Sequence, residues 1–246
     1  METTLNIRAD ILEKITKAAH NKKILVGFDL CHSAGVVPHH LSKQGVDFAY
    51  WCNYKYLNSG PGSTASLYIN KKHWSIHPGL AGWWGNDRST MFRMEATFDP
   101  AKTASAWQIG TISMLSAAPI EGSLRILCEA GIENIREKSL KMTDYLMFLV
   151  DEVLSKPPYN YSIVTPREPE RRGGHVAIAH KEGWRINQAL KARGVIPDFR
   201  PPNIIRLAPI PLYTKYHDVW KVARHLKKIV DGKEFLRFKD DRSIVT

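Results

Sequence analysis

Residues 51–62 read WCNYKYLNSGPG and continue a short apolar run, residues 48–51, that predicts a buried strand. Lys55 therefore lies just beyond a strand, with the glycine-rich turn 60–62 after it. A lysine amine in such a place can lose its proton, attack a carbonyl and form a Schiff base, most familiarly with pyridoxal phosphate. Most lysines that follow strands are ordinary surface residues, so the neighbouring segments must decide between the two interpretations.

A second buried strand is predicted upstream, at residues 24–28, and it ends at Asp29. Residues 9–22 before it have apolar positions at helical spacing, and a helix followed by a short turn and a buried strand is typical of a parallel α/β sheet. A carboxylate at the end of such a strand can pair with a pyridinium nitrogen or cap a following helix. His32 can stack on a planar cofactor or serve as an ordinary structural histidine.

The remaining pattern predicts two domains. A third strand is expected at 66–69, followed by an irregular segment, 71–103, whose length suggests a function. Further helices are expected at 105–118, 120–130, 132–154, 182–193 and 216–230, and further strands at 162–164, 175–178 and 204–207. Since Pro157-Pro158 ends a helix, we predict part of a large α/β domain over residues 1–156 and a small α+β domain over 157–246.

The charge balance raises the question of nucleic acid, because the 246 residues carry a formal net charge of +11. Acidic residues are interspersed with the basic ones, and the pairs Arg171-Arg172 and Lys227-Lys228 lack interleaved aromatic residues. We therefore predict a solvated basic surface and no nucleic-acid partner.

Other features of the composition bear on location and metals. No stretch reaches the roughly 20 apolar residues that span a bilayer, and the first residues lack the pattern of a signal peptide. The three cysteines, Cys31, Cys52 and Cys128, are odd in number and lack metal-type spacing. We predict a soluble, cytoplasmic protein with reduced thiols, no membrane contact and no metal site.

Several segments together resemble kynureninase, a pyridoxal phosphate-dependent hydrolase of fold type I, the aspartate aminotransferase fold. They occur in order between about residues 10 and 230 and comprise GFDLCHSAG at 27–35, GVDFA at 45–49, NYKYLN at 53–58, GWWG at 82–85 and residues 193–209. The resemblance implies the later part of a fold type I large domain, with a mostly parallel sheet and helices, followed by a small α+β domain. It also implies pyridoxal phosphate as the cofactor.

The resemblance implies a role for four residues near the predicted strands. Lys55 matches the lysine that forms the Schiff base, and Asp29 matches the partner of the pyridine nitrogen. His32 matches a residue beside the cofactor ring. Tyr54 matches the tyrosine that contacts the cofactor phosphate and is proposed as a proton donor.

Three further residues receive roles that involve a partner subunit or the substrate. Trp83 and Thr111 match groups that the neighbouring subunit of a homodimer contributes to the phosphate site. Arg206 matches the arginine that binds the substrate α-carboxylate, a task that suits a bidentate guanidinium. Asn86 departs from the family pattern, which has histidine after Gly-Trp-x-Gly.

The implied reaction is hydrolysis of the Cβ–Cγ bond of kynurenine or 3-hydroxykynurenine to alanine and an anthranilate, in tryptophan catabolism and NAD biosynthesis. The family has a further domain-sized lobe, on the order of 200 residues, ahead of the matching segment. That lobe supplies phosphate contacts, an aromatic residue that stacks on the ring and several strands. Two alternatives stay open. The chain is an inactive remnant that depends on a separate amino-terminal chain, or it is a class V aminotransferase or cysteine desulfurase.

Overall fold

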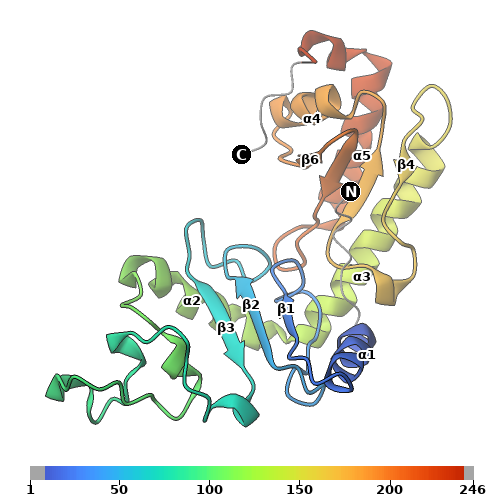
Figure 1. Cartoon of the computed structure of the whole chain (residues 1–246). Coiled ribbons are helices and arrows are strands. Elements are labelled where there is room, and N and C mark those ends of the chain that lie inside the picture. The colour runs from blue at the N-terminus through green and yellow to red at the C-terminus, as the bar shows by residue number, and fades with distance from the viewer. Residues whose placement is uncertain (1–8, 241–246) are drawn as a thin grey trace. The chain divides into compact units, whose positions relative to one another are not determined.

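The computed structural model describes residues 9–240, and the chain divides into two compact units, residues 1–132 and 133–246 (Figure 1). The predicted domain boundary after residue 156 falls inside the second unit. Helix α3 (Ile132–Leu149) and the π-helical turn Val150–Leu154 supply buried side chains to the core of that unit. The division into a large and a small domain at residue 156 stays a prediction.

The first unit contains the three predicted strands in the order β1–β2–β3 (Figure 1). Strand β1 (Gly27–Asp29) is parallel to β2 (Phe48–Cys52), and β3 (Ala65–Ile69) is antiparallel to β2. The core beneath them joins α1 (Ala9–His20) to β1 and β2. Its buried members are Leu12, Phe28, Leu30, Val46 and Ala49. The prediction of an α/β arrangement is confirmed, and the sheet is mixed.

The predicted strand at 24–28 is wrong in its first half. Regular pairing begins only at Gly27, and Ile24 and Leu25 are 54% and 59% exposed. Their continuous apolar pattern is typical of a strand covered on both faces, but the described part of the chain leaves more than half of each side chain exposed.

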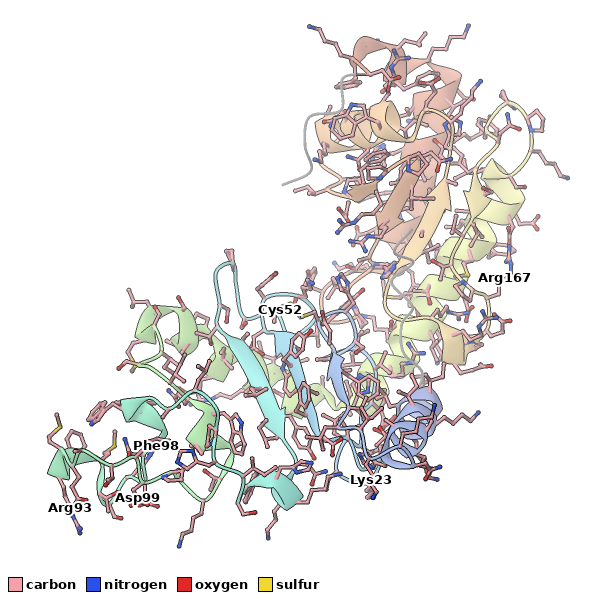
Figure 2. All side chains as sticks on the ribbon, viewed as in Figure 1. Lys23, Cys52, Arg93, Phe98, Asp99 and Arg167 are labelled. Carbon is pink, nitrogen blue, oxygen red and sulfur yellow. The ribbon has the colours of Figure 1, made fainter. Side chains whose placement is uncertain are left out.

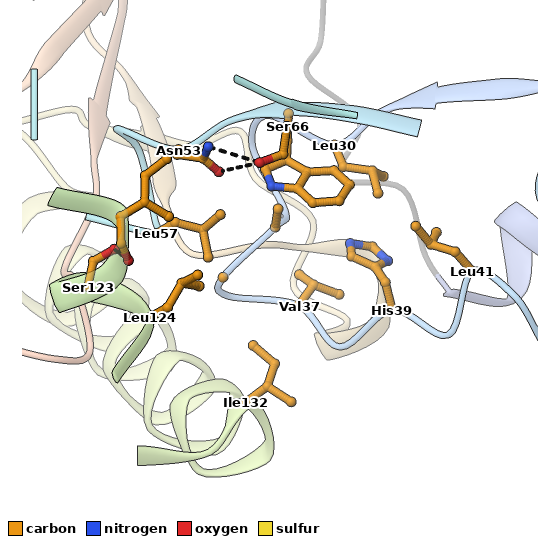
Figure 3. A pocket seen from close by; sticks show the side chains of 14 residues that line it. Leu30, Val37, His39, Leu41, Asn53, Leu57, Ser66, Ser123, Leu124 and Ile132 are labelled. Carbon is orange, nitrogen blue, oxygen red and sulfur yellow. Dashed lines mark hydrogen bonds between the residues drawn. The ribbon is translucent and has the colours of Figure 1, made fainter. Parts of the chain in front are cut away.

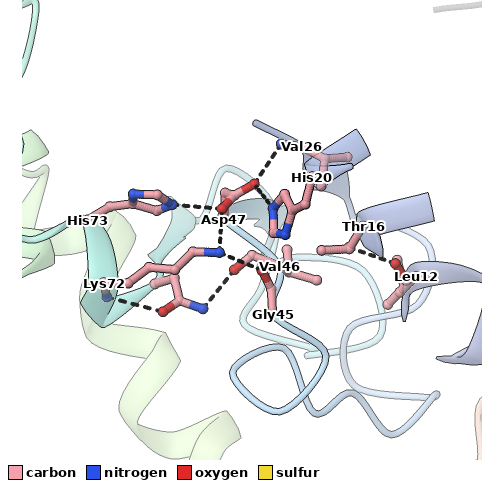
Figure 4. Close-up of polar contacts among 10 residues, drawn as sticks. Leu12, Thr16, His20, Val26, Gly45, Val46, Asp47, Lys72 and His73 are labelled. Carbon is pink, nitrogen blue, oxygen red and sulfur yellow. Dashed lines mark hydrogen bonds and ion pairs between the residues drawn. The ribbon is translucent and has the colours of Figure 1, made fainter. Parts of the chain in front are cut away.

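Asp47 is a buried charge that links four segments of the first unit (Figure 4). Its Oδ2 accepts a hydrogen bond from the Val26 N–H at 2.8 Å and lies 2.8 Å from His20 Nε2. Its Oδ1 lies 2.7 Å from both Lys72 Nζ and His73 Nε2. Burial raises the pKa of Asp47, but these hydrogen bonds lower it by a larger amount. The net pKa therefore lies well below the usual range. We call these five residues the Asp47 cluster.

The segment between β3 and α2 (Met114–Ala130) is largely irregular, as predicted. It contains four short 3₁₀ turns: Lys71–His73, Trp83–Gly85, Met91–Arg93 and Ala104–Trp107. The separate helix predicted at 105–118 is wrong. Gly110 interrupts the run, and the chain becomes helical again only at Met114, from where α2 continues through the second predicted helix.

The second unit is an antiparallel sheet packed with helices (Figure 1). Its strands are β4 (Ser162–Ile163), β5 (Val176–Ala179), β6 (Asp198–Arg200) and β7 (Ile204–Leu207), in the order β4–β5–β7–β6. Helices α3, α4 (Gly183–Ala192) and α5 (Tyr216–Asp231) share one core with β5 and β7. Every predicted element is present, and β6 was missed because three residues carry too little pattern.

Gly183 permits a close approach between α4 and the chain before β7. A Cβ added at this position would lie 2.6 Å from the Asn203 carbonyl oxygen. We expect Gly183→Ala to lower the free energy of unfolding by about 1–3 kcal/mol, since buried backbone must shift. Urea unfolding measures this. Gly122→Ala is the matched control, because its added Cβ meets open space within a helix and should raise stability by up to about 1 kcal/mol. An unchanged midpoint for Gly183→Ala would contradict the close approach.

Candidate active site

Lys55 and His32 meet at the carboxyl edge of the first unit's sheet. Lys55 Nζ lies 3.0 Å from His32 Nε2, although 23 positions separate the two residues. The contact follows from topology: β1 and β2 are parallel, so the segments that follow them emerge at the same edge. Asp29, the last residue of β1, is paired in register with Tyr50 of β2. The sequence-predicted lysine, histidine and aspartate are therefore brought to one place.

Asp29 is kept ionised by its surroundings. Partial burial raises the pKa of its carboxyl group, but hydrogen bonds from the Cys31 side chain and backbone lower it more. The backbone bond runs from Cys31 N–H to Asp29 Oδ1 at 2.8 Å. Electrostatic interactions with Lys55 and His32 lower the pKa further, so the net value lies below the usual range. The edge thus holds a carboxylate beside an amine and an imidazole.

Tyr54 projects from the same loop with 49% of its surface exposed. Its ring lies 5.9 Å from Lys55 Nζ. The neighbouring Cys52, through its charge and a side-chain hydrogen bond, raises the pKa of the Tyr54 phenol above its usual value. A tyrosine phenol carries its proton at neutral pH, and a raised pKa keeps it a hydrogen-bond donor.

Trp83 and Thr111 lie in the irregular segment of the first unit. Trp83 is 40% exposed, its indole N–H donates to the Met91 carbonyl at 2.9 Å, and its ring packs edge-on against Phe92. Thr111 is exposed in the stretch before α2. Exposed groups of this kind are open to a second molecule.

Asn86 has a structural task in the same segment. Its side-chain amide donates to the Trp83 carbonyl at 2.9 Å and accepts from the Asp99 N–H at 2.9 Å. Asn86, which departs from the family pattern, therefore connects the turn that carries Trp83 to the backbone at Asp99.

Arg206 belongs to β7 in the second unit. It stands directly across from Asp198 of β6, and its Nε donates to Asp198 Oδ2 at 2.6 Å. Only 13% of the Arg206 side chain is exposed. The Asp198 carboxylate thus positions the guanidinium. A carboxylate ligand would have to share the guanidinium with Asp198 or displace the Asp198 side chain from it.

Sequence reasoning missed a cavity of about 380 Å³ in the first unit (Figure 3). Leu30, Val37 and Leu124 are among its apolar lining residues, and Asn53 donates to Ser66 Oγ at 2.9 Å on one wall. None of the predicted site residues lines it. No motif marks the cavity, because its walls come from separate segments that meet only in the folded chain.

Comparison with known proteins identifies the family. The kynureninase C-terminal domain family matches residues 135–226. The chain is 52% identical to kynureninase of Geobacillus thermodenitrificans and 51% identical to that of Shouchella clausii, in each case over 234 residues that make up 95% of this chain and 54% of the relative. The chain belongs to the kynureninase family. It spans about half the length of the curated relatives it matches.

Solved structures show that this kynureninase-family chain has a fold type I architecture. Apo cysteine desulfurase from Thermococcus onnurineus matches with a TM-score of 0.73 at 16% identity, over 90% of this chain and 56% of that chain. Alanine–glyoxylate aminotransferase from Nostoc matches with a TM-score of 0.66 at 16% identity, over 89% and 57%. Identities this low establish the fold alone, whereas the kynureninases share about half of their aligned residues with this chain.

No helix within residues 9–240 is long and apolar enough to cross a membrane. The same residues contain no group of three or more histidine, cysteine, aspartate or glutamate side chains placed to hold a metal ion.

Proposed function

We propose that this chain is the carboxy-terminal half of a kynureninase-type hydrolase that carries pyridoxal phosphate on Lys55. The reaction is cleavage of the Cβ–Cγ bond of kynurenine or 3-hydroxykynurenine by water, which yields alanine and an anthranilate. The observation that carries the proposal is the 3.0 Å contact of Lys55 Nζ with His32 at the sheet edge that also bears Asp29. The 52% identity to a kynureninase supports the choice of reaction.

The chemistry of the groups at this edge fits pyridoxal phosphate. The cofactor has an aldehyde, a basic ring nitrogen and a phosphate, and when bound it supplies an electron sink. Lys55 offers the amine for the aldehyde, Asp29 the carboxylate for the ring nitrogen, and His32 an imidazole beside the ring. Tyr54 offers a protonated phenol for the phosphate.

Each of these residues then has a defined task. Asp29, ionised through its lowered pKa, keeps the ring nitrogen protonated. Lys55 would hold the cofactor aldehyde through its amine and, as a free amine, would move the proton at the substrate Cα. Arg206 binds the substrate α-carboxylate with its guanidinium, which Asp198 orients.

The proposal includes an amino-terminal partner region. Phe48 and Tyr50 project from one face of β2 and Leu67 from the same face of β3, where it pairs with Tyr50. These side chains are 38%, 46% and 47% exposed, which is unusual for a sheet face of a stable protein. Since the curated relatives are nearly twice as long as this chain, we assign this face to a polypeptide that corresponds to their other half.

A cytoplasmic homodimer completes the proposal. Trp83 and Thr111 are exposed, as groups that each subunit lends to the phosphate site of its partner need to be.

Complementation tests this function. The chain is expressed with and without the amino-terminal half of the Geobacillus thermodenitrificans kynureninase, and release of anthranilate from kynurenine is followed by fluorescence. We expect the two halves to copurify and to hydrolyse kynurenine only together, with each half alone as control. Copurified halves that bind pyridoxal phosphate but release no anthranilate would contradict the proposal.

A further inference from the structure

Cys31 and Cys52 lie side by side at the sheet edge that carries Lys55. The parallel register pairs Asp29 with Tyr50; Cys31 follows two residues after Asp29, beyond the end of β1, and Cys52 is the last residue of β2. The Cys52 N–H donates to Cys31 Sγ at 3.3 Å, and the Cys52 thiol donates to the Cys31 carbonyl at 3.9 Å. Figure 2 labels Cys52 at the end of β2. Both residues are partly buried, and both are free thiols.

The sulfur of Cys31 replaces a backbone group of the sheet. The Leu30 N–H donates to the Tyr50 carbonyl at 2.9 Å, as a parallel ladder requires. In a continued ladder the Cys52 N–H would bond to the Leu30 carbonyl, but it bonds to the Cys31 thiol. The Cys31 thiol also makes a side-chain hydrogen bond with Cys52. The two thiols therefore lie against each other, and a disulfide between them needs no large backbone movement.

We propose that Cys31 and Cys52 form a redox pair whose disulfide distorts the edge that holds Asp29, His32 and Lys55. Cys31 lies between Asp29 and His32 in the chain, and its thiol hydrogen-bonds to Asp29. A disulfide removes that bond and the bond from the Cys52 N–H. It also turns the backbone that places His32 against Lys55. The effect on cofactor loading rests on the proposed function, whereas formation of the bond does not.

The reaction with oxidised glutathione balances in two steps. Burial and the contact with Asp29 raise the pKa of the Cys31 thiol to about 11, so it is the slower nucleophile at neutral pH. The Cys52 thiolate therefore attacks the glutathione disulfide, forms a mixed disulfide and releases one glutathione thiolate. The Cys31 sulfur, after losing its proton to solvent, then attacks the Cys52 sulfur and releases the second. The two cysteines lose two protons and two electrons, and one glutathione disulfide becomes two thiols.

Cys128→Ser gives the working background, since Cys128 is exposed on α2 and would form bonds between molecules. This protein is equilibrated in mixtures of reduced and oxidised glutathione, alkylated and analysed by peptide mapping. We expect a peptide that links Cys31 to Cys52, reversed by dithiothreitol. Glutathione on Cys52 without the linked peptide would overturn the redox pair.

A second readout uses labelling of Lys55 by pyridoxal phosphate and borohydride. We expect the disulfide form to be labelled at least fivefold less than the reduced form, while Cys31→Ser in the same background shows no dependence on oxidant. Equal labelling of the two forms of the parent would overturn the effect on the edge. If the linked peptide forms but neither form is labelled at Lys55, the redox pair stands and the proposed cofactor site fails.

Discussion

Lys55→Arg is expected to abolish covalent attachment of pyridoxal phosphate, with a loss of labelling after borohydride of about 100-fold or more. Arginine preserves the positive charge beside His32 and Asp29, so the electrostatics of the sheet edge change little. Its guanidinium stays protonated at any accessible pH and does not add to an aldehyde. The variant therefore separates the nucleophilic amine from the charge that it carries.

Mass spectrometry of the reduced, digested protein locates the label. Lys43→Arg is the matched control, because Lys43 is an exposed lysine on the same unit and should leave labelling unchanged. Urea unfolding of both variants checks that the fold persists. Full labelling of Lys55→Arg at another lysine would show that the amine at position 55 is not the reacting group. In the complemented enzyme we expect Lys55→Arg to lose kynurenine hydrolysis as well.

Asp47→Asn is expected to destabilise the first unit by about 2–3 kcal/mol at pH 7. The substitution keeps the size of the side chain but removes its charge and turns one acceptor oxygen into an NH₂ donor. That donor then faces groups that themselves donate, from Lys72, His73, His20 and the Val26 N–H. Because the Lys72 and His20 side chains are 39% and 35% exposed, water relieves part of the loss.

The pH dependence of this effect has a definite sign. The pKa of Asp47 is lowered in the folded chain, so its contribution is fully present above the ordinary aspartate pKa of about 3.9 and is lost as pH falls through the folded value. Urea unfolding should give a difference between wild type and Asp47→Asn that shrinks as the pH falls below about 4. Asp231→Asn is the control: Asp231 also accepts from a lysine, but at the surface, and its loss should change stability little. A difference that does not shrink below about pH 4 would contradict the role of the Asp47 carboxylate.

The sequence predicted most of the secondary structure because long periodic segments carry their own pattern. Helix α5 was expected at 216–230 and is found at Tyr216–Asp231, and the strands before Lys55 and at 204–207 are found where their apolar runs lie. The wrong predictions have two causes: a single residue that interrupts a periodic pattern, and side chains that other elements do not bury. Gly110 broke a helix that periodicity favoured, and Ile24 and Leu25 have the pattern of a covered strand but are exposed.

The predictions about the candidate site also fall into two groups, those that are confirmed and those that stay proposals. The resemblance to kynureninase rested on ordered motifs, and the relatives at 51–52% identity confirm the family. The roles of Lys55, Asp29, His32 and Arg206 remain proposals. The sequence offered no sign that Asp198 holds Arg206, since strand β6 itself was missed.

By itself, then, the sequence determined the family, most of the helices and strands in their order, and the residue types available for chemistry at the ends of the predicted strands. Only the tertiary structure decided which of these residues meet: Lys55 with His32, Asp47 with His20 and His73, and Cys31 with Cys52. The reason is that each pair is separated by more than 20 positions and is joined through the packing of different elements. Periodicity is a property of neighbouring residues, whereas strand register and packing depend on the burial of the whole unit.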